Sequence, residues 1–169
     1  MTDDSTAART ITVANAGLDV LEHVLSYYIR TINIAVSRDL DDKLEGLEVA
    51  RGTGKITTLL LVDRHPGIRP SVIAQLILRD RSAMVRLVDY LEEEGLLTRK
   101  VDGQDNRAQG LFITAKGKQL ADTIRPIVTK QSREFFSDIT DEEHRLLVSI
   151  LGRTYRRIAG LTGEQRTGA

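Results

Sequence analysis

Two short helices joined by a tight turn are the feature that most restricts what this chain can fold into. Pro70 can open the first helix, because the first helical residue needs no N–H donor, and this helix is expected to end near Leu78. Asp80 is suited to cap the second helix and Gly95 to close it, since glycine tolerates a positive φ. The inward positions of the second helix are expected to be Met84, Val85, Val88 and Leu91. Such a pair is a helix-turn-helix.

A β-hairpin is expected directly after this pair of helices. Residues 96–101 and 108–113 look like strands, and Asp102-Gly103 between them is typical of a hairpin turn. The order of helices, helix-turn-helix, hairpin and helices predicts a mainly α fold of the α+β type. Its centre would be a winged helix-turn-helix with a β-hairpin wing.

Helices are also expected before this lobe. From Leu18 to Val36 the apolar residues recur at alternating steps of three and four, which predicts one long helix. Residues 40–49 suggest a shorter helix, residues 51–55 (RGTGK) a connection, and Ile56 and the apolar residues after it another helix.

Two further helices are expected after the hairpin. Thr114 can cap a helix from Ala115, which Pro126 should kink or divide. Thr140 and Glu143 have the spacing of a capping box for the last helix. The apolar stripes of the first and last helices exceed what a small winged core can cover, so we expect a second copy of the chain to cover them. The alternative is that they pack on each other within one subunit.

Composition argues against most catalytic and metal chemistry. The chain has no cysteine, which excludes disulfides, thiolate metal sites and cysteine nucleophiles. His23, His65 and His144 lie on separate segments, so we expect no metal and no other cofactor. The sequence also lacks a nucleophile elbow, a phosphate loop and a dinucleotide fingerprint, and we therefore expect no enzyme.

Charge is balanced overall but uneven along the chain. Residues 1–50 hold 4 Lys+Arg against 9 Asp+Glu, whereas residues 51–169 hold 20 against 15. This excess is too mild to predict nucleic-acid binding by itself. The N-terminus lacks the basic start and apolar run of a secretory signal, and no apolar run reaches membrane-spanning length. We therefore expect a cytoplasmic protein without a membrane partner.

The start of the second helix of the pair is rich in hydrogen-bond donors. In a helix-turn-helix this helix enters the major groove, and side chains near its start reach bases and phosphates. The donors there are Arg79, Arg81, Ser82 and Arg86, whereas Glu92–Glu94 lie at the far end. This polarity favours DNA at the N-terminal end, where the helix dipole also favours a phosphate. The alternative is that these charges only solvate an amphipathic helix.

The hairpin offers a thin cationic finger that can enter a minor groove, whose negative potential attracts arginine. Arg107 lies near its tip, and Arg99 and Lys100 flank the turn. Asp105 can accept a hydrogen bond from the guanidinium of Arg107 and hold it in one pose. The alternative is that Asp105 and Asn106 only form the turn and that Arg107 is a solvated surface charge.

The stretch IAQLILRDRSAMVRLVDYLEEEGLLTRKVDGQDNRAQGLFITAKGKQL carries a recognisable pattern. It follows the order of helix, recognition helix, Leu-x-x-x-Gly-Leu, Arg, an Asp-x-Arg wing and Leu-Thr-x-x-Gly. Most of the match is carried by Leu91, Gly95, Leu96, Arg99, Asp105, Arg107, Thr114 and Gly117. In this pattern the chain resembles the MarR family of winged helix-turn-helix transcriptional regulators. The resemblance spans about Lys55 to Leu120.

The resemblance implies a homodimer with interlocking terminal helices, a recognition helix in the major groove of double-stranded DNA and a wing in the minor groove. Its DNA contacts would be Arg81, Ser82 and Arg86 on the helix and the pair Asp105 and Arg107 on the wing. The domains would then be a disordered arm (1–15), N-terminal dimerisation helices (16–50), the DNA-binding lobe (51–114), C-terminal dimerisation helices (115–161) and a disordered tail (162–169). Ala83 and Asn106 depart from the commonest family pattern, and each change removes one DNA contact.

The resemblance also implies a small anionic aromatic effector, bound between the dimerisation helices and the DNA-binding lobe. The candidate lining residues are Tyr27, Tyr28, Arg30 and His65. The alternative is that the tyrosines only pack in an interface.

The sequence therefore predicts a transcriptional regulator, a repressor that occupies a pseudo-palindromic operator as a homodimer. The alternative is a winged-helix protein-interaction or assembly module, whose arginines bind a protein. The acidic run Glu92–Glu94 and the zero net charge keep this alternative open.

Overall fold

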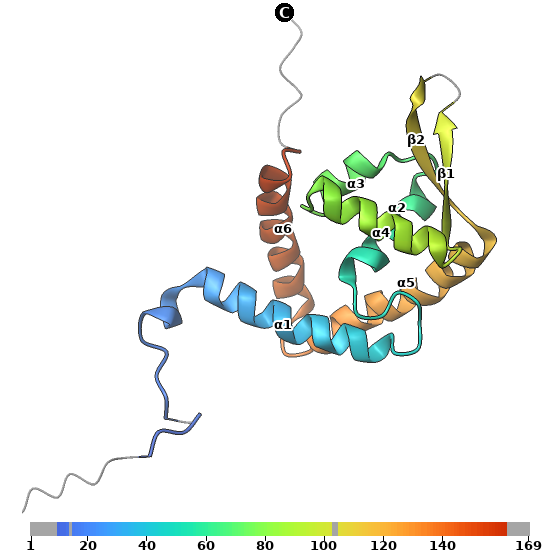
Figure 1. Ribbon diagram of the computed structural model, residues 1–169. Helices are drawn as coiled ribbons and strands as arrows, with labels where there is room; N and C mark the ends of the chain where they lie inside the picture. The colour runs from blue at the N-terminus through green and yellow to red at the C-terminus, as the bar shows by residue number, and fades with distance from the viewer. Residues whose placement is uncertain (1–9, 14, 103–104, 162–169) are drawn as a thin grey trace, which may run out of the picture. The chain divides into compact units, whose positions relative to one another are not determined.

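The computed structural model describes residues 10–13, 15–102 and 105–161, with the backbone alone at 101–102 and 105–108. The chain divides into two compact units, residues 1–35 and 36–169, and each is described by itself. The elements are a 3₁₀ helix η1 (Asp19–His23), α1 (Leu25–Lys43), α2 (Thr53–Arg64), α3 (Pro70–Leu76), α4 (Arg81–Glu93), β1 (Leu97–Asp102), β2 (Asp105–Ile113), α5 (Ala115–Phe135) and α6 (Asp141–Ile158). Figure 1 labels the α-helices and the strands. The expected mainly α fold with a β-hairpin wing is confirmed. The predicted disorder of the ends falls largely outside the described residues.

The first unit holds η1 and the start of α1, where a single helix from Leu18 was predicted. That prediction is wrong, because Val24 has the extended dihedrals φ −104° and ψ 98° between the two elements. Asp19 takes a left-handed φ of 52°, and the N–H of Leu18 donates to the carboxylate of Glu22. These local contacts hold the segment in a tight turn, so α1 begins only at Leu25.

The second unit begins inside α1, and the predicted helix over residues 40–49 is also wrong. Residues up to Lys43 continue α1, and a series of turns follows. Gly46 has a φ of 84°, which a right-handed helix cannot accommodate. Leu44 and Val49 on either side are fully buried, so this loop is anchored in the core. Because α2 starts at Thr53, part of the predicted connection 51–55 is helical.

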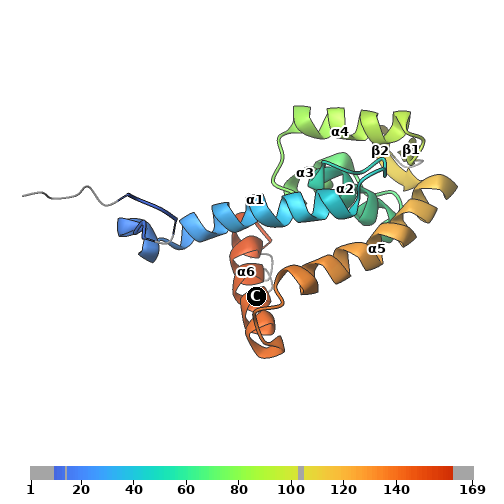
Figure 2. The ribbon, with the colours of Figure 1, turned by 90° about the horizontal axis from the view of Figure 1, so that it is seen from below.

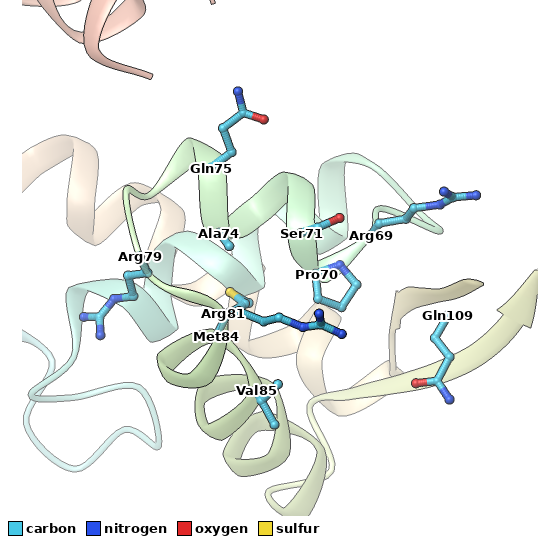
Figure 3. A pocket seen from close by; sticks show the side chains of 10 residues that line it. All are labelled: Arg69, Pro70, Ser71, Ala74, Gln75, Arg79, Arg81, Met84, Val85 and Gln109. Carbon is cyan, nitrogen blue, oxygen red and sulfur yellow. The ribbon is translucent and has the colours of Figure 1, made fainter. Parts of the chain in front are cut away.

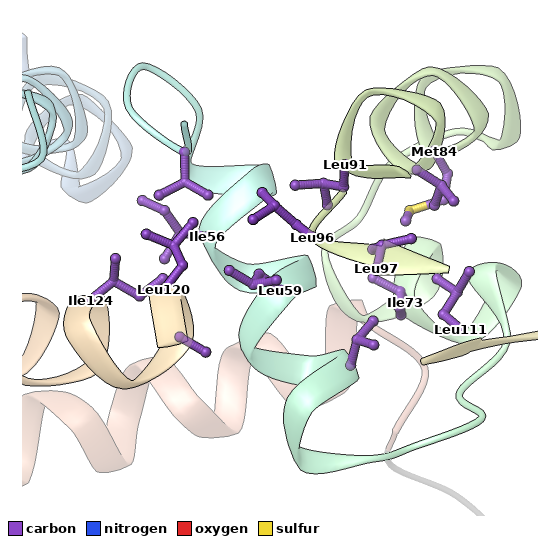
Figure 4. Packing of buried hydrophobic residues seen from close by; sticks show 14 of the residues in the cluster. Ile56, Leu59, Ile73, Met84, Leu91, Leu96, Leu97, Leu111, Leu120 and Ile124 are labelled. Carbon is purple, nitrogen blue, oxygen red and sulfur yellow. The ribbon is translucent and has the colours of Figure 1, made fainter. Parts of the chain in front are cut away.

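A single apolar core holds the winged lobe together around α2, which contacts α4, α5 and β2. Figure 4 shows how its side chains converge from the helices and the hairpin. Each fully buried aliphatic side chain stabilises the fold by about 1.5–3 kcal/mol. The labelled members are Ile56, Leu59, Ile73, Met84, Leu91, Leu96, Leu97, Leu111, Leu120 and Ile124.

The hairpin pairs β1 with β2 antiparallel, from Leu97 opposite Ile113 to Val101 opposite Gln109. The base of the hairpin is hydrogen-bonded to the segment before α3. The N–H of Gly67 donates to the carbonyl of Leu111, and the N–H of Leu111 donates to the carbonyl of Ile68. The wing therefore leaves the core beside the start of α3.

The helix after the hairpin begins where its cap predicts, since the Thr114 hydroxyl accepts from the N–H of Gly117 at 3.0 Å. Pro126 lies inside α5 without dividing it, so the predicted division is wrong (Figure 2). Proline removes only one intrahelical hydrogen bond, and buried Ala121 and Ile124 hold α5 to the core just before it. The capping box at Thr140 is present at the start of α6. No helix within the described residues is long and apolar enough to cross a membrane.

Candidate nucleic-acid interface

The turn between α3 and α4 is closed by backbone hydrogen bonds that fix the relative directions of the two helices. The N–H of Arg79 donates to the carbonyl of Ala74 at 2.9 Å, and the N–H of Leu78 donates to that of Gln75 at 3.3 Å. This is a Schellman closure, in which the residue after the helix takes a left-handed conformation. Leu78 occupies that place with a φ of 54°, where glycine is usual. The start of α4 is thereby brought beside α3.

Asp80 caps α4, as its sequence position predicts. Its carboxylate accepts from the N–H of Ala83 at 2.7 Å and from the hydroxyl of Ser82 at 2.7 Å. The bond from Ala83, and after it the bond from Ser82, lowers the pKa of Asp80. The Ser82 proton is thus directed to Asp80, while the hydroxyl stays exposed in the first turn of α4.

A cavity of about 730 Å³ lies between α3, α4 and β2. In Figure 3 the Arg81 side chain extends from α4 across the opening toward Pro70, with Arg69 beyond it and Gln109 facing it from β2. Arg69, Arg81 and Gln109 are all exposed. Ten residues line the cavity, namely Arg69, Pro70, Ser71, Ala74, Gln75, Arg79, Arg81, Met84, Val85 and Gln109. We call this cavity the α3–α4–wing groove.

Arg69 and Gln109 were missed in the sequence, because three separate segments build this groove. A weak signal existed for each of them. Arg69 directly precedes the helix-opening Pro70, and Gln109 is a polar residue next to the hairpin turn. Both line the same cavity as Arg81, although the Arg69 side chain extends away from Arg81 in Figure 3.

Arg79 also lines the groove, but its guanidinium and that of Arg81 point in different directions. Figure 3 shows its side chain extending away from Arg81. Its guanidinium lies against the start of α2, where a Cβ added to Gly54 would be 3.1 Å from its Nε. The Arg79 guanidinium is therefore directed toward the start of α2, and Arg79 is less suited to a DNA contact in the groove than its sequence position indicates.

Arg86 lies on the outer side of α4 and is exposed. Within the described part of the chain its guanidinium makes no hydrogen bond or ion pair, although its charge contributes to the lowered pKa of Asp80. This cation is available to a phosphate or a base edge.

Arg99 is assigned to DNA by its place in the sequence, and the structure shows it bound to carboxylates of α4. Its guanidinium donates to the carboxylates of Asp89 and Glu92 on α4, and its own N–H donates to Glu92 at 3.0 Å. The side chain is only 24% exposed. Arg99 therefore joins β1 to the C-terminal half of α4, and two carboxylates already balance its charge, so it is less suited to DNA than its sequence position indicates. Its assignment to DNA stays a prediction.

The wing pair and the effector residues stay predictions. Asp105 and Arg107 contribute backbone to β2, and their side chains lie outside the described residues. Tyr27, Tyr28 and Arg30 belong to the first unit and His65 to the second, so the predicted crevice joins two units that are described separately. Within the first unit the two tyrosine rings meet edge to face, with centroids 5.4 Å apart.

Comparison with known proteins agrees with this architecture. The sequence profile of the MarR family matches residues 49–108. A Thauera aromatica protein, described as a transcriptional regulatory protein for the hcr operon, is 30% identical over 149 residues. The match covers 85% of this chain and 89% of that protein.

Solved structures share the fold. The S. aureus MepR–DNA complex is 25% identical with a TM-score of 0.67, over 77% of this chain and 95% of that chain. The PcaV regulator of Streptomyces coelicolor, solved with its natural ligand, is 20% identical with a TM-score of 0.71, over 82% and 96% of the two chains. The winged lobe, the family profile and the nearly full-length relative together show that this chain belongs to the MarR family of transcriptional regulators.

Proposed function

We propose that this regulator is a repressor that binds a pseudo-palindromic operator in double-stranded DNA as a homodimer. The observation that carries the proposal is the α3–α4–wing groove, which Arg69, Arg81 and Gln109 line from three separate segments. A helix-turn-helix presents this side of its second helix to the major groove. The MepR–DNA complex supports this mode of binding through its shared fold.

The charges along α4 support the same orientation. Its first half carries the exposed cations Arg81 and Arg86, whereas its second half carries Asp89 and Glu92, which Arg99 partly neutralises. DNA approaching the first half meets cations and the positive end of the helix dipole. DNA approaching the second half would meet Glu93, which is exposed. We assign the DNA contacts on α4 to its first two turns.

The homodimer is proposed from apolar faces that each unit leaves uncovered. On α6, Leu147, Leu151 and Ile158 are 44%, 49% and 56% exposed. On the first unit, Leu25 and Ile29 are 70% and 47% exposed. Apolar stripes of this size are normally covered by a partner surface. We propose residues 16–50 and 115–161 as the dimerisation helices and residues 51–114 as the DNA-binding lobe.

Release by a small effector belongs to the same proposal. A second cavity of about 480 Å³ lies between the end of α1, α2 and α5. Most of its lining is apolar, and Arg64, which also lines it, has no ion pair among the described residues, which suits a small anionic aromatic compound. The ligand-bound PcaV structure shares the fold and supports an effector. The apolar lining residues are Leu40, Ile56, Leu60, Leu61 and Val128.

The proposal is tested by selecting bound sequences from a random duplex pool with the purified full chain at two salt concentrations. We expect an enriched inverted repeat whose affinity falls steeply with salt. Arg81→Ala and Arg86→Ala should weaken binding, whereas Arg133→Ala, an exposed arginine of α5, should not. Salt-sensitive binding without enrichment, or no binding, would contradict the proposal and favour a protein-interaction module.

A further inference from the structure

Val85 is exposed on α4, although the sequence places it among the inward residues. Met84, Val88 and Leu91 are at most 1% exposed, as predicted, but Val85 is 48% exposed. Figure 3 shows Val85 on α4 below Arg81, with Gln109 across from it on β2. Val85 therefore belongs to the lining of the α3–α4–wing groove and not to the core.

Neither folding nor solubility explains a valine at this position. A β-branched residue has a lower helix propensity than alanine, and half of its surface gains nothing from burial. Val72 on α3 is equally exposed at 45%, but it lies outside the groove. Single exposed valines are ordinary, so the informative feature is the site of Val85 among the donors of the groove.

We propose that Val85 contacts the C5-methyl group of a thymine in the major groove and selects that base. This inference rests on the proposed function, in which α4 enters the major groove. The methyl group of thymine is the apolar feature of base edges there, and small apolar side chains recognise it. Arg81 lies one helical turn before Val85 and Arg86 follows it, so this methyl contact would lie between two cationic contacts.

The size of the effect follows from one buried methyl group. Covering one such group contributes about 0.8 kcal/mol, which corresponds to about a fourfold change in affinity per half-site. The effect concerns one base position in each half-site. It is therefore separate from the uniform loss that follows when a phosphate contact is removed.

The test uses two random duplex pools, one synthesised with thymidine and one with deoxyuridine, which lacks only the methyl group. The wild-type chain is expected to enrich a thymine at one position of each half-site from the first pool and to lose that preference in the second. The sequence enriched from the first pool is then titrated with thymine or uracil at that position. Wild type should bind the thymine duplex about fourfold more tightly per half-site. Val85→Ser, which replaces the apolar side chain by a hydroxyl, should bind both duplexes equally, and Val72→Ser is the matched control that keeps the preference.

The possible outcomes distinguish a failure of the Val85 contact from a failure of the proposed operator binding. No binding to either pool would refute the proposed function and this inference with it. Specific binding in which wild type does not distinguish thymine from uracil would overturn the role of Val85 alone. A preference for thymine that persists in Val85→Ser would also overturn it, because the methyl group would then act through DNA shape or through another residue.

Discussion

Arg99 and Arg86 offer a test in which one substitution should change stability and the other DNA binding. Arg99 holds the carboxylates of Asp89 and Glu92 from β1, whereas Arg86 makes no ion pair among the described residues. We expect Arg99→Ala to destabilise the fold and to leave the salt dependence of DNA binding unchanged. We expect Arg86→Ala to leave the stability of the fold nearly unchanged and to reduce the salt dependence of DNA binding.

The magnitudes follow from the exposure of the groups. Asp89 and Glu92 are 46% and 35% exposed, so solvent reduces each ion pair to at most about 1 kcal/mol. Removing Arg99 also leaves two carboxylates three residues apart on one helix, which adds a few tenths of a kcal/mol. The loss should total about 1–2 kcal/mol, or a Tm lower by about 2–8 °C. For Arg86→Ala, stability should change by less than about 0.5 kcal/mol.

The assays are urea unfolding and titration of the selected operator over a range of salt concentrations. Each lost phosphate contact reduces the slope of log K against log salt by about 0.9, so a dimer of Arg86→Ala should lose about 2 units. If Arg99→Ala flattens the slope as much as Arg86→Ala does, Arg99 contacts DNA. The pairing of Arg99 with Asp89 and Glu92 would then not keep it from the DNA surface.

Three further substitutions test the packing of the winged lobe. Thr58 is fully buried and its hydroxyl finds no hydrogen-bond partner among the described residues, so Thr58→Val should raise the free energy of unfolding by about 1–2 kcal/mol, measured in urea. A Cβ at Gly117 would lie 1.9 Å from the carbonyl oxygen of Leu96. Gly117→Ala should therefore lower the free energy of unfolding by more than about 3 kcal/mol and lower the urea midpoint sharply. The guanidinium of Arg125, and after it Lys118, lowers the pKa of Asp63. Because the pKa of Asp63 is lower in the folded state, the stability that its ion pairs contribute is fully present above the unfolded-state pKa of about 4. It is lost as the pH falls through the folded-state pKa. Wild type should therefore exceed Asp63→Asn in stability at pH 7, and the gap should close in acid. A gap that persists there would contradict the assignment.

The elements that could be predicted from sequence are those whose signals are local. The Asp80 cap, the Thr140 capping box and the glycine at Gly95 each act within a few residues, and the structure has all three. The hairpin follows in the same way from its turn and its flanking strands. These signals fixed the order of the elements and thus the class of the fold.

The sequence is least informative where a side chain has possible partners that are distant in sequence. Arg99 is on a strand, and its carboxylates come from α4, so only the packed structure shows which face of the hairpin it takes. Val85 follows the buried Met84 directly, and an apolar pair at adjacent helix positions leaves the inward face ambiguous. The sequence alone does not show that Arg69 and Gln109 line the same groove as Arg81, because this depends on the position of the wing beside α3.

The contacts between α6 and α3 tie the proposed dimer to the proposed DNA contacts. The Tyr155 hydroxyl donates to the carbonyl of Leu76 at 2.8 Å, and the Gln75 amide donates to the carbonyl of Ala159 at 2.9 Å. Both bonds end on backbone atoms, so they fix α6 against the last turn of α3. Because the closed turn at Leu78 in turn fixes α4, a dimer that joins through α6 sets the separation of its two recognition helices by rigid elements. The protein should therefore accept only a narrow range of half-site spacings, because a changed spacing would strain these bonds.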